Sequence, residues 1–429
     1  DPKERKQRGV FYTPRPVVSY IVRSVHELLQ TEFGLENGLA DTTTWGEMAE
    51  RNKDLEIPDG MKPKDPFVQI LDPATGTATF LVETIEVIFE AMKERWKAEG
   101  KMELEYQALW NEYVPKHLLP RLHGYELMMA PYAIAHMKIG IKLYETGYRF
   151  KAKERARIYL TNALEPPSDI QTELEVVSPA LAHEAKAVNE IKHDKKFTVV
   201  IGNPPYSGHS ANQGEWIGQL IGDYYRVDGK LLGEKNTKWL QDDYMKFLRF
   251  AQHQNEQTQV GILGFITNNG YLDNPTFRGM RRSFMQTYND VRILDLHGNV
   301  KKREISPDGS ADKNVFDIQQ GVGITISSIK PKNKEAGEAD VLHADLFGSR
   351  ERKYKFLFAH SMAETQLDRL CPNSPFYLFV YQEQTSRDDY ESGWGINEIF
   401  PLHSLGIVTA RDDLCIQWSS ADVWSTAKD

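Results

Sequence analysis

The stretch that most constrains this chain is an apolar run at residues 197–201 that stops at Gly202 and is followed by Asn-Pro-Pro-Tyr at residues 203–206. The run is continuous rather than alternating and is rich in β-branched residues, which is typical of a parallel strand covered on both faces. Two consecutive prolines lack N–H donors and keep the residue before each of them out of the helical region. The sequence therefore predicts a buried strand whose carboxyl end carries a stiff, extended segment with free carbonyl groups.

That stiff segment offers hydrogen-bond acceptors to an exocyclic amino group. The side-chain oxygen of Asn203 and the carbonyl of Pro204 would hold both N–H groups of an aromatic amine such as adenine N6, and Tyr206 offers a flat face for stacking. Chemistry of this kind depends on positioning and on electrostatic stabilisation, so it requires no cysteine, metal or strong base. The alternative interpretation is a rigid turn capped by a partly buried tyrosine.

Composition narrows the class of protein. The chain has 429 residues, which exceeds the size at which a single core keeps growing, so we expect one large domain plus a smaller one. No apolar run approaches the ~20 residues of a membrane span, and two cysteines, Cys371 and Cys415, indicate neither a disulfide scaffold nor a zinc cluster. We expect a cytoplasmic protein with no membrane partner and no metal site.

The net charge of −9 does not indicate a general nucleic-acid coat. A polyanion would instead meet a local basic face. Two basic clusters are candidates, although each could equally be a solvated surface. They are Arg278, Arg281 and Arg282, and Lys301, Lys302 and Arg303.

Near the amino terminus, Phe11-Tyr12-Thr13-Pro14 precedes a helical pattern of apolar residues at 17–29. Thr13 is expected to cap this helix, with Pro14 in its first turn. The free N–H groups of such a helix start suit a carboxylate or phosphate. Residues 31–66 are expected to form a loop with a short helix.

A second strand is expected at residues 67–71, followed by a small-residue turn at 72–80 and a helix at 81–93. Asp72 lies at the carboxyl end of the strand, where doubly wound sheets bind cofactors. Gly76 is the only glycine of the turn, which has neither the G-x-G-x-x-G of a dinucleotide site nor the G-K-[ST] of a P-loop. The turn therefore favours another cofactor.

The remaining chain alternates strands with helices, which predicts an α/β fold with a seven-stranded, mostly parallel sheet. Glu126 ends one strand at a position that commonly binds ribose hydroxyls. The last strand is expected to form an antiparallel hairpin at one edge of the sheet. The five further strands are expected at 122–126, 157–160, 260–266, 291–296 and 321–326.

Together, these stretches resemble the amino-group DNA methyltransferases of the gamma class, which use S-adenosyl-L-methionine. Phe11 to Pro14 resembles their amino-terminal cofactor motif, residues 72–80 their principal cofactor loop, and residues 203–206 their catalytic NPPY motif. The order of these motifs is also that of the family. The resemblance covers residues 8–330 and implies a Rossmann-like methyltransferase fold.

The resemblance also implies roles for individual residues. Asn203, Pro204, Pro205 and Tyr206 would be catalytic, and Tyr206 would stack on the target base together with Phe316. Ala78 departs from the family, which usually has a second glycine there. Cofactor binding is implied for Phe11, Tyr12, Thr13, Asp72, Pro73, Ala74, Thr75, Gly76, Thr77, Phe80, Glu126, Asn162, Ala163 and Leu164.

Among these families, the chain is most similar to the methyltransferase portion of single-chain Type ISP restriction-modification enzymes. That resemblance implies double-stranded DNA as partner and nuclease and helicase domains in a longer native chain. It also suggests three parts: a helical amino-terminal segment with the cofactor motif (1–66), a catalytic domain (67–330) and, after a linker, the start of a target-recognition domain (340–429).

Adenine-N6 methylation of DNA, with the base flipped out of the duplex, is the function that these motifs favour. The absence of a Pro-Cys pair after a strand argues against cytosine C5 chemistry. Transfer to cytosine N4, RNA or a protein glutamine stays open, since the same amide and proline geometry suits each. A DNA-binding specificity module without turnover is the alternative from another class.

Overall fold

The computed structural model describes residues 12–151, 154–167, 179–206, 210–234, 236–331, 337–383, 389–390, 392–402 and 416–428. Phe11 of the expected cofactor motif and Cys415 lie outside these residues. The chain divides into two compact units, residues 1–381 and 382–429. The candidate site lies in the first unit.

The first unit is built on a nine-stranded sheet with the order β11-β10-β8-β9-β7-β4-β1-β2-β3. Neighbouring strands are parallel except at the β7–β9, β8–β9 and β10–β11 pairs. A separate two-stranded hairpin is formed by β5 and β6. The strands are β1 (Ile70–Asp72), β2 (Leu122–Glu126), β3 (Arg157–Leu160), β4 (Val199–Gly202), β5 (Arg226–Val227), β6 (Lys230–Leu231), β7 (Gly261–Asn268), β8 (Asp290–Asp295), β9 (Val322–Ile329), β10 (Asp340–Asp345) and β11 (Asp368–Leu370).

The prediction of an α/β fold with a mostly parallel sheet is confirmed, but the prediction of seven strands is wrong. The seven expected strands are all present, and β10 and β11 extend the sheet beyond β8. Both added strands come from residues 340–370, which the sequence assigned to the start of a target-recognition domain. The antiparallel strand β9 lies between β7 and β8 rather than at the edge, because it pairs with both of them.

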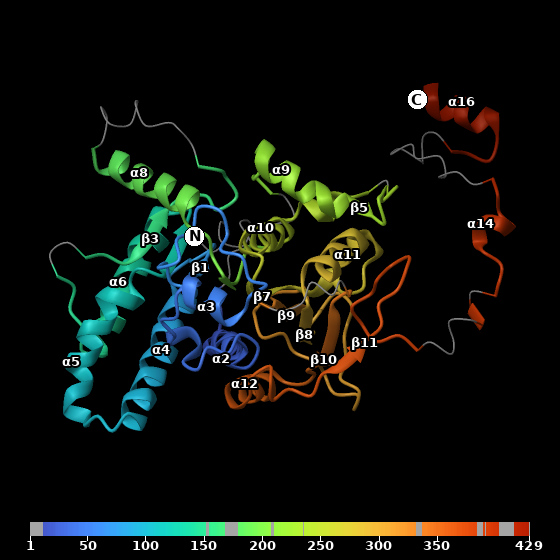
Figure 1. The fold of residues 1–429 in the computed structure, drawn as a ribbon. Helices are drawn as coiled ribbons and strands as arrows, with labels where there is room; N and C mark the ends of the chain where they lie inside the picture. The colour runs from blue at the N-terminus through green and yellow to red at the C-terminus, as the bar shows by residue number, and fades with distance from the viewer. Residues whose placement is uncertain are drawn as a thin grey trace. The chain divides into compact units, whose positions relative to one another are not determined.

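Helices cover both faces of the sheet (Figure 1). On one face α2 packs against α4 and α12, and on the other α10 and α11 pack over β4, β7 and β8. The helices are α2 (Arg15–Thr31), α3 (Trp45–Arg51), α4 (Thr79–Ala98), α5 (Glu103–Tyr113), α6 (Met129–Glu145), α8 (Pro179–Asp194), α9 (Glu215–Ile221), α10 (Asp243–Thr258), α11 (Arg278–Thr287), α12 (Arg350–Ala359), α14 (Ile396–Ile399) and α16 (Ser420–Lys428).

This layering explains why the central strands read as continuous apolar runs. Every residue of β1, β2 and β4 is buried, as expected for parallel strands with helices on both faces. Helix α2 presents Val18, Ile21 and Val25 to the core, each fully buried. Parallel strands place their carboxyl ends at one edge of the sheet, so the residues after β1, β2 and β4 converge there.

The second unit contains α14 and α16 in its described residues. Its aromatic side chains Trp394, Trp418 and Trp424 are largely exposed. Among the described helices of the whole chain, none is both long and apolar enough to cross a membrane.

Candidate active site

The turn after β1 surrounds a buried carboxylate. Asp72 is 1% exposed and accepts a hydrogen bond from the Ala74 amide at 3.1 Å. The pKa of Asp72 is raised to about 8, mainly by burial. The hydrogen bond from the Ala74 amide lowers the pKa, and the charge of Glu126 adds to the increase. Gly202 at the end of β4 is close by, since a Cβ there would lie 2.8 Å from Asp72 Oδ1. The acid of the cofactor loop and the start of the catalytic motif are therefore neighbours.

The turn itself needs left-handed backbone at two positions, Gly76 (φ 56°) and Ala78 (φ 64°). Left-handed conformation costs a residue with a Cβ about 1–2 kcal/mol, which explains why a glycine suits position 78. Ala78 nevertheless fits, fully buried, immediately before α4. Ala74, Gly76 and Thr77 keep part of their surface exposed, while Pro73, Thr75 and Phe80 are buried. The open side of the turn therefore consists of small residues.

Glu126 ties the turn to the end of β2. Its carboxylate accepts hydrogen bonds from the Gly76 amide and the Met128 amide, both at 2.8 Å. Burial raises the pKa of Glu126 despite these amide donors. The carboxylate that the sequence assigned to ribose thus also fixes the position of the cofactor loop.

Gly124 is a residue of this site that sequence reasoning missed. A Cβ there would lie 2.4 Å from Thr75 Oγ1 and 2.8 Å from Ile158 Cδ1. The Thr75 amide donates to the Tyr125 carbonyl at 2.9 Å, so the turn packs directly against β2. A glycine inside a buried strand is a signal of such close approach.

Asn203 joins the amino-terminal motif to the catalytic motif. Its Nδ2 donates to Thr13 Oγ1 at 2.9 Å, and its Oδ1 accepts from the Tyr206 hydroxyl at 2.6 Å. The prediction that Thr13 caps α2 is wrong: the helix begins at Arg15 with Pro14 as its cap residue. The Thr13 hydroxyl oxygen instead accepts a hydrogen bond from the Asn203 side chain.

Tyr206 is more enclosed than the sequence suggested. The residue is 6% exposed, its hydroxyl also donates to the Ile266 carbonyl at 3.1 Å, and its ring meets Tyr244 edge-on at 6.3 Å between centroids. Burial raises the pKa of Tyr206 well above its usual value, so the phenol is a neutral donor. In this state the Tyr206 hydroxyl contacts the Asn203 oxygen that the amino group of a target base would need.

Tyr12 lies apart from these residues. It is 60% exposed, and Lys138 Nζ lies 6.0 Å from its ring centroid. The same ammonium group is 3.4 Å from the hydroxyl oxygens of Thr77 and Thr79. Tyr12 and the cofactor loop are therefore linked through α6.

The segment after β3 is held by side chains that sequence reasoning did not identify. Asn162 Oδ1 accepts from the Leu164 amide, and its Nδ2 donates to Asn212 Oδ1 at 2.8 Å. Asn212 in turn donates to Asp243 Oδ1 at 2.9 Å, and the buried Lys246 donates to the Asn212 carbonyl. Nothing in the local sequence predicted this chain of bonds, because its members come from three distant segments. Ala163 and Leu164 are buried.

Phe316 lies in the segment between β8 and β9, not after β1, β2 or β4. Its side chain is 4% exposed, its amide donates to Asn314 Oδ1 at 2.8 Å, and its carbonyl accepts from Arg350 of α12. Tyr354 of α12 donates to the neighbouring Val315 carbonyl. The loop carrying Phe316 is therefore held by α12, and stacking on a base stays a prediction.

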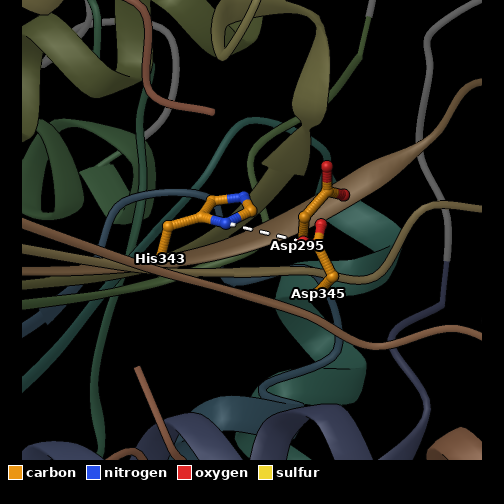
Figure 2. A group of neighbouring side chains, drawn as sticks. All are labelled: Asp295, His343 and Asp345. Atoms are coloured by element: carbon orange, nitrogen blue, oxygen red, sulfur yellow. Dashed lines mark ion pairs between the residues drawn. The ribbon is translucent and has the colours of Figure 1, made fainter. Parts of the chain in front are cut away.

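A cluster of titratable side chains lies at the carboxyl ends of β8 and β10 (Figure 2). Asp295, His343 and Asp345 each offer a ligand atom, and these atoms lie within 4.8 Å of one another. Figure 2 shows the His343 ring directed toward the two carboxylates, with Nδ1 3.8 Å from Asp345 Oδ2. These are the described residues best placed to hold a cation, and His297 also lies among them.

His297 supplies a positive charge to this cluster. Its Nε2 is 2.8 Å from Asp345 Oδ1, and its Nδ1 is 3.7 Å from Asp295 and 3.9 Å from Glu304. Burial alone would lower its pKa, but the bonds to Asp345 and Glu304 and the charge of Asp295 raise the pKa of His297 to about 9. At neutral pH an imidazolium therefore neutralises part of the carboxylate charge.

The basic cluster on α11 serves the fold. Arg281 is fully buried and donates to the carbonyls of Tyr271, Asn274 and Phe376. Its two neighbours bind acidic residues: Arg278 pairs with Glu234, and Arg282 pairs with Asp228 and Glu338. For this cluster, the interpretation as a nucleic-acid surface has no support.

Residues 121–301 match the family model described as "Eco57I restriction-modification methylase". A comparison with curated protein sequences finds no significant match. The sequence match thus spans β2, β3, β4, β7 and β8, including Glu126 and the catalytic motif.

Three solved structures are similar to nearly the whole of this chain. The ATP-dependent Type ISP restriction-modification enzyme LlaBIII, bound to DNA, is 25% identical over 98% of this chain, with a TM-score of 0.68. The DrdV–DNA complex shares the fold, with 24% identity over 100% of this chain and a TM-score of 0.67. A nuclease-deletion mutant of the Type ISP enzyme LlaGI with a DNA substrate mimic also shares it, with 23% identity over 97% of this chain and a TM-score of 0.69. This chain spans 26%, 38% and 31% of those three chains.

Of the three motifs singled out in the sequence, the family match includes residues 203–206, whereas residues 12–13 and 72–80 lie outside it. The predicted resemblance to restriction-modification methyltransferases is thus confirmed, since residues 121–301 match the Eco57I restriction-modification methylase model and Type ISP enzymes are among the structural neighbours.

Proposed function

We propose that this chain is an S-adenosyl-L-methionine-dependent DNA methyltransferase that modifies adenine N6 of a base flipped out of the duplex. One observation carries the proposal: Asn203, directly after β4, is bonded to Thr13 of the amino-terminal motif, and the adjacent Gly202 lies so close to Asp72 of the cofactor loop that a Cβ there would be 2.8 Å from Oδ1. Three separated motifs thus meet at one sheet edge, as the family resemblance requires.

The residues present suit the cofactor. A turn of small, partly exposed residues next to the buried Asp72 lets a ligand approach the backbone, and Glu126 lies one strand away for ribose hydroxyls. When bound, S-adenosyl-L-methionine supplies an electrophilic methyl group on a positively charged sulfur. The residues that would hold it are Tyr12, Thr13, Asp72, Ala74, Gly76, Thr77, Glu126, Asn162, Ala163 and Leu164.

Asn203 and Pro204 would orient the target amino group. The Asn203 oxygen and the Pro204 carbonyl accept its two N–H bonds and stabilise the positive charge that develops on nitrogen. The Tyr206 hydroxyl occupies one of the two lone pairs of the same Asn203 oxygen, so the second can accept a bond from the target amino group. The bond from Asn203 to Thr13 keeps the amide oriented.

Double-stranded DNA is the proposed partner, supported by the DNA-bound LlaBIII structure. We also propose that the native protein is longer and carries nuclease and helicase domains, that residues 340–429 include the start of a target-recognition domain, and that the protein is cytoplasmic. The small share of the relatives' length that this chain covers supports the first of these proposals.

The direct test is to incubate the chain with unmethylated genomic DNA and isotope-labelled S-adenosyl-L-methionine, digest the DNA to nucleosides and identify the labelled product. Labelled N6-methyladenine is expected. Labelled N4-methylcytosine would keep the amide mechanism and change the base. If calorimetry shows cofactor binding while no nucleoside is labelled, the DNA-methylation proposal for this chain fails, and RNA, glutamine or a binding role becomes the better interpretation.

A further inference from the structure

The second basic cluster, unlike the one on α11, lies on an exposed loop. We call residues 299–304 the basic loop. Lys301, Lys302 and Arg303 are all exposed, and two exposed apolar side chains flank them, Val300 (60%) and Ile305 (65%). Lys302 pairs with Asp273 at 2.8 Å, whereas Lys301 and Arg303 form no ion pair with any other described residue. Two positive charges are therefore available to a partner.

The basic loop leaves the sheet at the same edge as the catalytic motif. β7 is parallel to β4, and both β7 and β8 are antiparallel to β9, so β8 runs in the direction of β4. The chain leaves β8 at Asp295 and enters β9 at Val322. The intervening segment, which includes the basic loop, thus belongs to the edge where a duplex would have to approach Asn203.

Hydrogen bonds between its own residues hold the basic loop in one conformation. Glu304 accepts from the Asn299 amide at 2.7 Å, and Asn299 Oδ1 accepts from the Lys302 amide at 3.1 Å, which closes the loop on itself. His297 connects this closure to the sheet through Glu304 and Asp345 and stacks on Phe347 at 3.8 Å between ring centroids. A loop ordered in this way loses little entropy when its cationic tips bind.

Asp295, the last residue of β8, anchors His297 to the sheet. It accepts from the Asn269 side chain and from the His297 amide, both at 2.9 Å. The carboxylates of Figure 2 therefore bind His297 and through it the loop, and a metal ion would have to displace this imidazolium. The cluster is better explained as the support of the basic loop than as a metal centre.

We propose that the basic loop binds the phosphate backbone of duplex DNA through Lys301 and Arg303. This inference rests on the proposed function, because it assumes a DNA substrate. A chain with a net charge of −9 needs local cationic sites to meet a polyanion, and backbone contacts of this kind position a duplex without reading its sequence. The exposed Val300 and Ile305 add apolar contact next to the charges.

Because backbone contacts do not depend on sequence, the test does not require the recognition site. The affinity of the full chain for a fluorescein-labelled duplex of arbitrary sequence would be measured by anisotropy over a series of salt concentrations. The double variant Lys301→Ala/Arg303→Ala is expected to bind about tenfold more weakly and to reduce the slope of log K against log salt by about 2, one for each lost phosphate contact. Cofactor affinity, measured by calorimetry, should not change.

The matched control is Lys97→Ala/Lys101→Ala, which removes the same charge from exposed positions at the carboxyl end of α4 and just beyond it. A retained slope in this control supports the inference. An equal loss in both double variants, or no loss in Lys301→Ala/Arg303→Ala while the wild-type chain binds DNA, overturns it and leaves the proposed methyltransferase intact. A wild-type chain that binds the cofactor but no DNA would overturn both.

Discussion

At the carboxyl ends of β1, β2 and β4, backbone groups hold the candidate site, whereas at the ends of β8 and β10 charged side chains hold the basic loop. In the first region the carboxylates of Asp72 and Glu126 bind main-chain amides, and Gly124 and Gly202 let the segments touch. In the second region the His297 imidazolium joins three carboxylates, those of Asp295, Glu304 and Asp345. The first arrangement depends on steric fit and the second on protonation, so different changes should disrupt them.

The largest effect should come from Asn203→Ala in the backbone-held region. Loss of the amide removes one acceptor from the reacting amino group, which should lower turnover about 10²–10³-fold. Affinity for S-adenosyl-L-methionine should change far less, and steady-state kinetics with calorimetry would separate the two. Asn111→Ala on α5, which removes an amide bonded to the Gln107 and Gly147 carbonyls, is the control. Unchanged turnover would contradict the role of Asn203 and favour a binding module.

Gly124→Ala tests whether steric fit holds the cofactor loop. The new Cβ would meet Thr75 Oγ1 at 2.4 Å, so the turn must move. We expect the free energy of unfolding to fall by about 1–3 kcal/mol and cofactor affinity to fall about tenfold. Gly140→Ala on α6 is the control, because nothing lies within 4 Å of that position. Equal behaviour of the two variants in urea unfolding and calorimetry would refute this account of the loop.

His297→Gln tests the charge-held region. The folded-state pKa of His297 is about 9, above the ~6.5 of an unfolded histidine, so its stabilisation is complete below about pH 6.5 and is lost as the pH rises through 9. Asp345 and Glu304 face the ring with lowered pKa values and stay ionised over this range, whereas burial raises the pKa of the third carboxyl group, Asp295.

In urea unfolding, His297→Gln should therefore cost about 1–3 kcal/mol near pH 6 and much less near pH 10. His193→Gln, in an exposed pair with Asp194, should cost little at either pH. A loss for His297→Gln that does not depend on pH would show that its packing on Phe347, rather than its charge, supports the loop.

Tyr206→Phe should have the smallest effect. It removes the hydroxyl that donates to Asn203 and to the Ile266 carbonyl but keeps the buried ring. We expect a loss of about 1 kcal/mol in the free energy of unfolding and a change in turnover of less than tenfold. Tyr206→Ala should lower turnover much more, because it also removes the stacking face. Equally low turnover in the two variants would mean that the hydroxyl, not the ring, is essential.

Sequence patterns located much of the fold and of the candidate site. The seven expected strands and the motifs at residues 12–13, 72–80 and 203–206 depend on local features such as apolar runs, paired prolines and small-residue turns. Strands β10 and β11 were not expected, because nothing local distinguishes a strand that extends a sheet from one that begins a new domain. The capping role of Thr13 was wrong because a distant partner, Asn203, engages its hydroxyl.

The sequence by itself determined where strands end and which rigid or small residues follow them, since these depend on neighbours along the chain. Only the tertiary structure decided which of those ends face one another. It placed Tyr206 against Asn203 and Ile266, connected Asn162 to Asp243 through Asn212, and gathered Asp295, His297, Glu304 and Asp345 beneath the basic loop. The longer of these contacts join residues 31 to 60 positions apart, and they form because parallel strands bring their carboxyl ends to one edge.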